Sequence, residues 1–155
     1  MMLLNGLILA SALVFPHNTP YQLNEEAKSL LSAGRNLEAV AAARQAVAEA
    51  SAEFGARHPA TAMILRNLAS ACERSGYYSL AEYNAKLALS ILEETFGPGD
   101  VSLVPVLNVL AETYFAQGRH AEAREAAQRA VAIGPEAGEH HKLARHNLAA
   151  IRGAR

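Results

Sequence analysis

The chain contains a single cysteine and no tryptophan, and charged residues make up only 19% of its 155 residues. One cysteine excludes an intramolecular disulfide and a zinc site built from cysteines. Lys and Arg number 14 and Asp and Glu number 15, so the formal net charge is −1. The basic excess that a general nucleic-acid-binding surface needs is therefore missing. Alanine is the most frequent residue instead, and 51% of the chain is hydrophobic, which favours closely packed helices around a core.

The longest apolar run, residues 1–15, is shorter than the roughly 20 residues that a helix needs to span a bilayer. It carries no charged side chain, which is typical of the apolar part of a secretory signal. Ala10-Ser11-Ala12 has the form of a cleavage site, and a cut before Tyr21 is the alternative. We therefore expect residues 1–20 to be a signal-like or flexible segment of an exported protein, periplasmic or secreted, with no stable membrane span. The alternative is a cytoplasmic protein whose N-terminal segment is unstructured or packs on the first repeat.

The clearest pattern in the chain is an internal repeat, which brings Gly34 into register with Gly76 and then with Gly118. A shorter fourth copy follows, because His146-Asn147-Leu148-Ala149 resembles Arg66-Asn67-Leu68-Ala69 but is displaced by about one helical turn. The missing turn is most simply lost from a helix that ends near Ile133. Residues of the same type coincide in three successive copies: Leu23, Leu65 and Leu107; Ala27, Ala69 and Ala111; Gly34, Gly76 and Gly118; Ala39, Ala81 and Ala123; and Ala46, Ala88 and Ala130.

Each copy has the composition of two helices joined by a short turn. A first helical stretch ends at the shared glycine, which can take the left-handed conformation that closes a helix. A second stretch begins two residues later, and its alanines seven residues apart lie on one face, where small side chains let two helices approach closely. The sequence therefore predicts an all-α solenoid of antiparallel helix pairs. We expect one domain over residues 21–155, with repeats at about 21–53, 54–95 and 96–133 and a capping helix at 139–152.

Phe54-Gly55-Ala56-Arg57-His58-Pro59, followed by Leu65-Arg66-Asn67-Leu68-Ala69, resembles the tetratricopeptide repeat (TPR) family, in the 42-residue subtype found in kinesin light chains. The resemblance covers roughly residues 21–152. It implies a right-handed superhelix in which the first helix of each pair lines the concave side, where partner peptides lie, and a binding scaffold rather than a catalyst. The third copy has Phe96-Gly97-Pro98-Gly99-Asp100 without His-Pro, and the first copy lacks the preceding turn.

The candidate groove consists of polar residues beside the buried stripe of each first helix. Asparagine can pair with a peptide backbone, Lys28 and Arg66 could hold a carboxylate, and Glu73 and Glu112 could hold a basic group. Asn67 and Asn147 are assigned to the groove by the resemblance. The alternative for each residue is an ordinary exposed face without a ligand, and Asn67 could bond a neighbouring helix instead. The predicted groove residues are Asn24, Lys28, Arg66, Asn67, Ser70, Asn108, Glu112 and Asn147.

Motifs for catalysis, metal binding or cofactor binding are not found in the sequence. His140, His141 and His146 cluster, but no two lie four residues apart on one helical face, so they favour a solvated surface over a metal site. Cys72 falls on the buried stripe and is expected to be a core residue rather than a reactive thiol. We expect no catalytic residue, metal or cofactor. The enzymatic alternative is a metal-dependent hydrolase that uses the C-terminal histidines.

The sequence thus predicts a non-enzymatic scaffold or adaptor that binds a protein or peptide, and not nucleic acid, in its groove. The alternative is a structural assembly or secretion accessory module that self-associates through the ends of the solenoid. That alternative rests on the N-terminal end, which has no capping helix if residues 1–20 are removed. A homo-oligomer is therefore a second expectation.

Overall fold

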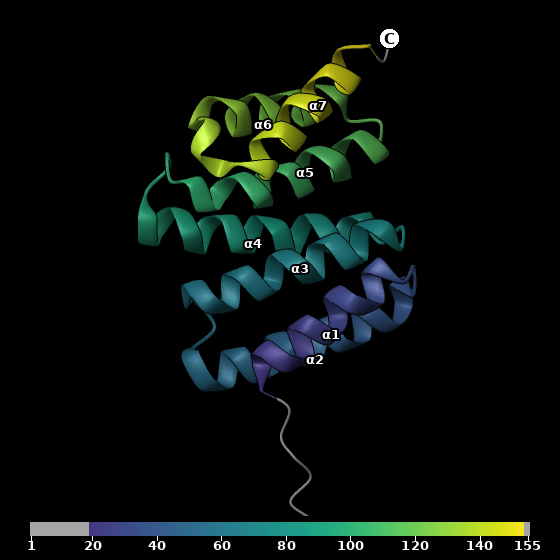
Figure 1. The fold of residues 1–155 in the computed structure, drawn as a ribbon, viewed down its shortest axis with the longest axis vertical. Coiled ribbons are helices and arrows are strands. Elements are labelled where there is room, and N and C mark those ends of the chain that lie inside the picture. The colour runs from purple at the N-terminus through teal and green to yellow at the C-terminus, as the bar shows by residue number, and fades with distance from the viewer. Residues whose placement is uncertain (1–18, 154–155) are drawn as a thin grey trace, which may run out of the picture.

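The computed structural model describes residues 19–153 and shows a single stack of helices (Figure 1). Within that range the chain is all helical and contains no strand. None of its helices is long and apolar enough to cross a membrane. Its α-helices are α1 (Pro20–Ser32), α2 (Asn36–Phe54), α3 (Pro59–Arg74), α4 (Tyr78–Phe96), α5 (Val104–Ala116), α6 (His120–Ile133) and α7 (Glu139–Gly153), with short 3₁₀ turns η1 (Val101–Leu103) and η2 (Pro135–Ala137).

Local sequence signals explain where the first helices begin. At α1, Thr19 and Gln22 form a reciprocal capping box, and Pro20 occupies the first turn. Thr19 and Pro20, which the sequence analysis assigned to the N-terminal segment, belong to the start of α1, and residues 1–18 lie outside the described part of the chain. The His58-Pro59 pair starts α3, with His58 Nδ1 accepting the backbone N–H of Ala60 at 3.1 Å.

The shared glycines close the first helix of each repeat. Gly34, Gly76 and Gly118 have φ values of 74°, 79° and 73°. Residues other than glycine rarely adopt this left-handed backbone conformation. After Gly76 the chain turns back, and the N–H of Tyr77 donates to the carbonyl of Cys72 at 2.8 Å. The second helix begins two residues after the glycine in all three repeats, as predicted from the sequence.

The alanine pairs lie where the helices approach most closely. Ala39 and Ala46, Ala81 and Ala88, and Ala123 and Ala130 are all 0% exposed. Larger side chains such as Ile64, Ile91, Leu92 and Leu107 fill the space around them. Small side chains at these positions let the paired helices approach closely, as the spacing of the alanines predicts. Cys72 is 1% exposed and packs in the core, which confirms its predicted structural place.

Successive pairs stack into a right-handed α-solenoid with three repeats and a C-terminal capping helix. The first helices α1, α3, α5 and α7 contact one another in that order along one side of the stack, and each also packs against its neighbouring second helix. Helix α6 has 14 residues where α2 and α4 have 19, which explains the displaced fourth copy. Helix α7 covers the C-terminal end with Ala144, Leu148 and Ile151 (Figure 1).

Candidate interaction surface

The side of the stack formed by α1, α3, α5 and α7, here called the first-helix surface, carries the predicted groove residues. Asn24 on α1 and Asn67 on α3 lie opposite each other, and the Asn67 amide donates to Asn24 Oδ1 at 2.6 Å. Each of the two residues is only 9% exposed. The two asparagines therefore join the first two repeats. This is the alternative that the sequence analysis gave for Asn67, a bond to a neighbouring helix.

The asparagines at the C-terminal half of this surface also bridge helices. Asn108 on α5 is 2% exposed and donates its amide to the carbonyl of His140 at 2.8 Å. Asn147 on α7 donates to Glu112 Oε1 on α5 at 2.9 Å. Asn108 is therefore buried with its amide nitrogen bonded within the chain, and it does not belong to the exposed part of this surface. Asn147 and Glu112 remain partly exposed.

Arg66 is the cation best placed to meet a ligand on this surface. It lines a hollow together with Met63, Ser102, Pro105 and His140. Three arginines of the described chain are about half-buried, and Arg119 and Arg129 each pair with a carboxylate. Arg66 forms no ion pair within residues 19–153. A partly desolvated guanidinium without a counter-charge favours an anionic ligand.

Burial and charge shift the protonation of several groups around Arg66. Burial lowers the pKa of the Arg66 guanidinium, although arginine stays charged. Burial and the nearby Arg66 charge lower the pKa of His140, in that order of size. His140 is therefore neutral at pH 7, and Arg66 supplies the fixed positive charge of the hollow.

Acidic and apolar groups lie beside this cationic hollow. Burial and the charge of Glu112 raise the pKa of Glu73, and Arg74 lowers it. A second hollow between α5 and α7 is mostly apolar and is lined by Ala111, Phe115, Ala150 and Ile151 with Glu112 and Asn147 at its side. The surface therefore offers one cationic, one acidic and one apolar contact on rigid helices. Of the remaining predicted residues, Lys28 is exposed and paired with Glu25 at 2.8 Å, and Ser70 is half-buried.

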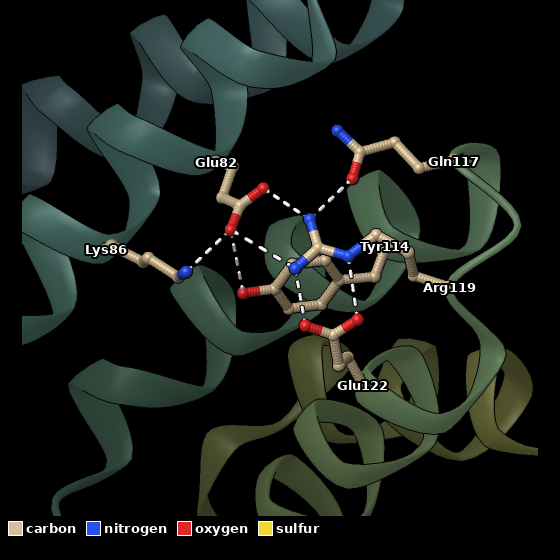
Figure 2. A network of polar contacts seen from close by, with 6 residues as sticks. All are labelled: Glu82, Lys86, Tyr114, Gln117, Arg119 and Glu122. Carbon is tan, nitrogen blue, oxygen red and sulfur yellow. Dashed lines mark hydrogen bonds and ion pairs between the residues drawn. The ribbon is translucent and has the colours of Figure 1, made fainter.

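A polar network that the sequence did not predict joins α4, the end of α5 and the start of α6 (Figure 2). Glu82 on α4 accepts hydrogen bonds from Arg119 at 2.6 Å and from Lys86 at 2.6 Å. Burial raises the pKa of Glu82, but these hydrogen bonds and charges outweigh it and lower the pKa overall. Arg119 also pairs with Glu122 and lies over the ring of Tyr114. The network joins the second repeat to the third.

Two adjacent glutamates near the end of α4, Glu93 and Glu94, also contact other elements. Glu93 pairs with Arg129 on α6, and Glu94 accepts from Arg57 at 2.5 Å. Two adjacent residues of a helix point in different directions, so the sequence alone could not show that Glu93 reaches the third repeat and that Glu94 reaches Arg57 at the start of its own repeat.

These helix pairs and their packing define an α-solenoid repeat protein. The chain belongs to the tetratricopeptide repeat family, because the model of this family matches residues 22–94 and 78–136, more than half of the chain. No curated protein gives a significant match.

Solved structures carry the same fold. Nearly identical TPR-like repeats of a kinesin light chain-like protein from Podosopora anserina have a TM-score of 0.74 and 25% sequence identity over 84% of this chain. A single-substitution variant of those repeats has a TM-score of 0.73 at the same identity and coverage. The chain spans 64% of the length of each of these structures. The predicted resemblance to kinesin light chain-type repeats is thereby confirmed. Repeats of this family generally mediate protein–protein interactions and are typically not catalytic.

Proposed function

We propose that the protein is a non-enzymatic adaptor that binds a protein or peptide partner along the first-helix surface. The observation that carries this proposal is Arg66, a half-buried arginine without an ion-pair partner in the described chain, beside a hollow. By the family resemblance this is the concave side, where partner peptides lie. A carboxylate of the partner would bond the Arg66 guanidinium in two parallel hydrogen bonds.

The other groups of the surface suggest how the rest of a partner is held. An apolar side chain fits the hollow beside Phe115 and Ile151, and a basic group fits near Glu73 and Glu112. The helices and the asparagine bridges are already formed, so the protein itself loses little conformational entropy on binding. Neither a metal nor a cofactor enters this proposal.

We further propose that residues 1–18, with their uncharged apolar run, direct export of the protein. These residues lie outside the described part of the chain. Sequencing the N-terminus of the protein purified from its native organism tests the proposal, and a retained Met1 or Met2 would contradict it.

The experiment for the adaptor role begins with affinity capture from the native organism and identification of the bound proteins by mass spectrometry. The binding constant of the captured partner is then measured with Arg66→Ala and with Arg44→Ala as the matched control. Arg44 is exposed on α2 and forms no ion pair within residues 19–153. We expect Arg66→Ala to weaken binding at least tenfold and Arg44→Ala to change it less than twofold. Equal affinities for both variants, with unchanged helical content, would refute the use of this surface.

A structural module that self-associates through the solenoid ends is the second candidate. The observation that favours it is the N-terminal end, where a hollow beside Leu23 and Leu30 is open within the described chain. Sedimentation over a range of concentrations distinguishes the two candidates, because end-to-end association increases the mass with concentration whereas the adaptor alone does not.

A further inference from the structure

Two hollows of the molecule are related by the repeat. The inner one lies between α4 and the third repeat, and α4 contributes Lys86 and Leu89 to it. The other lies at the N-terminal end of the stack, on α1 and α2. The N-terminal hollow is lined by Leu23, Glu26, Leu30, Arg35, Glu38, Ala41, Ala42 and Gln45. Two repeats later, at the equivalent positions, stand Leu107, Leu110, Tyr114, Arg119, Glu122, Glu125, Ala126 and Arg129, of which all but Arg119 line the inner hollow.

Within residues 19–153 no helix stands over the N-terminal hollow in the place that α4 takes at the inner one. In and beside the inner hollow, α4 contacts the third repeat through an acidic, a basic and an aliphatic side chain. Glu82 accepts from Arg119 Nη1 at 2.6 Å, Lys86 lies 5.8 Å from the centroid of the Tyr114 ring, and Leu89 lines the wall. These three side chains are spaced four and three residues apart, so they lie on one face of α4.

Arg35 has the arrangement that Arg119 uses to hold α4. Its Nε donates to Glu38 at 2.7 Å and its Nη2 also bonds Glu38. Arg119 bonds Glu122 with the same two nitrogens, its Nε donating at 2.7 Å. Arg119 Nη1 bonds Glu82, whereas Arg35 Nη1 forms no hydrogen bond within the described chain. The N-terminal end thus presents the same guanidinium, oriented by its own glutamate, without the carboxylate from a preceding helix.

The N-terminal hollow differs from the inner one at two positions that matter for binding, and one of them brings in a further charged residue. Glu26 stands where the third repeat has the buried Leu110, and its charge raises the pKa of Arg35 after the larger effects of Glu38. Leu30 stands in the place of Tyr114. A lysine at the Lys86 position of an incoming helix would therefore meet the Glu26 carboxylate rather than an aromatic ring.

We infer that the N-terminal end of the solenoid is a docking site for an amphipathic helix of a partner protein. The helix carries a carboxylate, a lysine or arginine one turn later and a leucine on the same face, which is the pattern of Glu82, Lys86 and Leu89. Arg35 holds the carboxylate, Glu26 holds the cation, and Leu23, Leu30 and Ala42 cover the leucine. This site is separate from the first-helix surface and does not depend on the adaptor proposal.

A partner helix fits this site better than a second copy of the chain. The helix exposed at the opposite end is α7, whose outer hollow is lined by Lys142, Arg145 and His146. Its one exposed carboxylate-to-lysine pair, Glu139 and Lys142, is three residues apart and already bonded to itself at 2.5 Å. The pattern of α4 does not recur on it.

The test uses a labelled synthetic peptide with the sequence of α4, residues 78–96, added to the full-length chain. We expect saturable one-to-one binding with a gain in helical circular dichroism, because a free peptide of this length is only marginally helical. Arg35→Ala in the protein, or Glu82→Ala in the peptide, is expected to weaken binding at least fivefold, and the two changes together should weaken it little further. Arg44→Ala in the protein is the matched control and should leave binding unchanged.

Several results would overturn the inference. One is no detectable binding, which is also the result expected if residues 1–18 cover the hollow. Another is binding that survives Arg35→Ala, and a third is binding that is lost with Arg66→Ala, which would move the peptide to the first-helix surface. Dimerisation of the chain without peptide that Arg35→Ala abolishes would assign the end to a second copy instead.

Discussion

The guanidinium carbon of Arg119 lies 4.4 Å from the centroid of the Tyr114 ring, and the same side chain donates to Glu82 at 2.6 Å (Figure 2). The aromatic face limits the positions of the guanidinium, and the carboxylates of Glu82 and Glu122 accept its hydrogen bonds. Because Glu82 belongs to α4 whereas Tyr114, Arg119 and Glu122 belong to the third repeat, this contact couples two repeats that the Glu93–Arg129 ion pair and apolar packing also join.

Removal of the charge of Glu82 tests the strength of this coupling. Glu82→Gln should lower the free energy of unfolding by about 1 kcal/mol, the upper end for an ion pair that is only partly exposed. Glu38→Gln is the control, because the side chains of Glu38 and Arg35 are 57% and 56% exposed and the loss of their ion pair should produce no measurable change. Urea unfolding followed by circular dichroism measures both, and equal midpoints would contradict the expectation.

The contact between Glu82 and Arg119 also predicts that the stability of the protein depends on pH. The pKa of Glu82 is lowered in the folded protein from its ordinary value of 4.5, so its ionised form is favoured by folding. The stabilisation is therefore fully present above that ordinary value and is lost as the pH falls through the lowered pKa. The difference in stability between the natural protein and Glu82→Gln should be constant from pH 7 to about 5 and shrink below about pH 4.5. A difference that grows on acidification would refute this assignment.

Glycine at the end of a first helix is required by backbone conformation alone. Gly76 has φ of 79°, and a Cβ added there meets no atom within 4 Å. Gly76→Ala should therefore destabilise by about 1–2 kcal/mol through left-handed strain without any clash. Gly99 also has open space, but its φ is not positive, so Gly99→Ala should be neutral or slightly stabilising. Thermal unfolding of the two variants compares them directly.

The alanine crossings leave no room for a larger side chain. Ala88 on α4 is 0% exposed, and Ala88→Leu should cost about 1–3 kcal/mol because neighbouring side chains must leave their rotamers. Ala48→Leu, on the exposed side of α2, should change stability by no more than about 0.5 kcal/mol. Denaturant midpoints of the two variants would contradict this picture if they were equal.

The charge of Arg66 is expected to act on His140. Burial and Arg66 together lower the pKa of His140, and Arg66→Met removes the charge while keeping the apolar stem. The pKa of His140 should therefore rise in this variant, as followed by the imidazole proton shifts in an NMR titration. Arg44→Met should leave it unchanged. If the titration of His140 is the same in the natural protein and in both variants, the charge of Arg66 does not affect His140.

Much of the fold followed from the sequence because it is encoded in short-range spacing. Gly34, Gly76 and Gly118 mark the turns, and the alanines seven residues apart mark the buried faces of the second helices. The partners of polar residues were harder to predict. The spacing placed Asn24 and Asn108 beside a groove, but the face of a helix does not say how close the next helix lies. Close approach of the first helices covers both residues and turns their amides toward neighbouring helices.

Arg66 was predicted as a groove residue from the sequence. The structure adds the hollow that Arg66 lines. Its hollow includes His140, which belongs to the capping helix α7 and is therefore distant from Arg66 in the sequence. Neither a repeat pattern nor helix periodicity relates these two positions, because the fourth copy is out of register by about one turn. Only the packing of α7 on the stack brings them together.

The bond between Asn67 and Asn24 joins the first two repeats with neutral dipoles, whereas Glu82, Arg119, Glu93 and Arg129 join the second to the third with ions. Mobile salt screens the latter and leaves the former unaffected. Ionic strength therefore acts on one joint of the solenoid. Added salt should therefore weaken the contacts between the second and third repeats more than the contacts between the first and second.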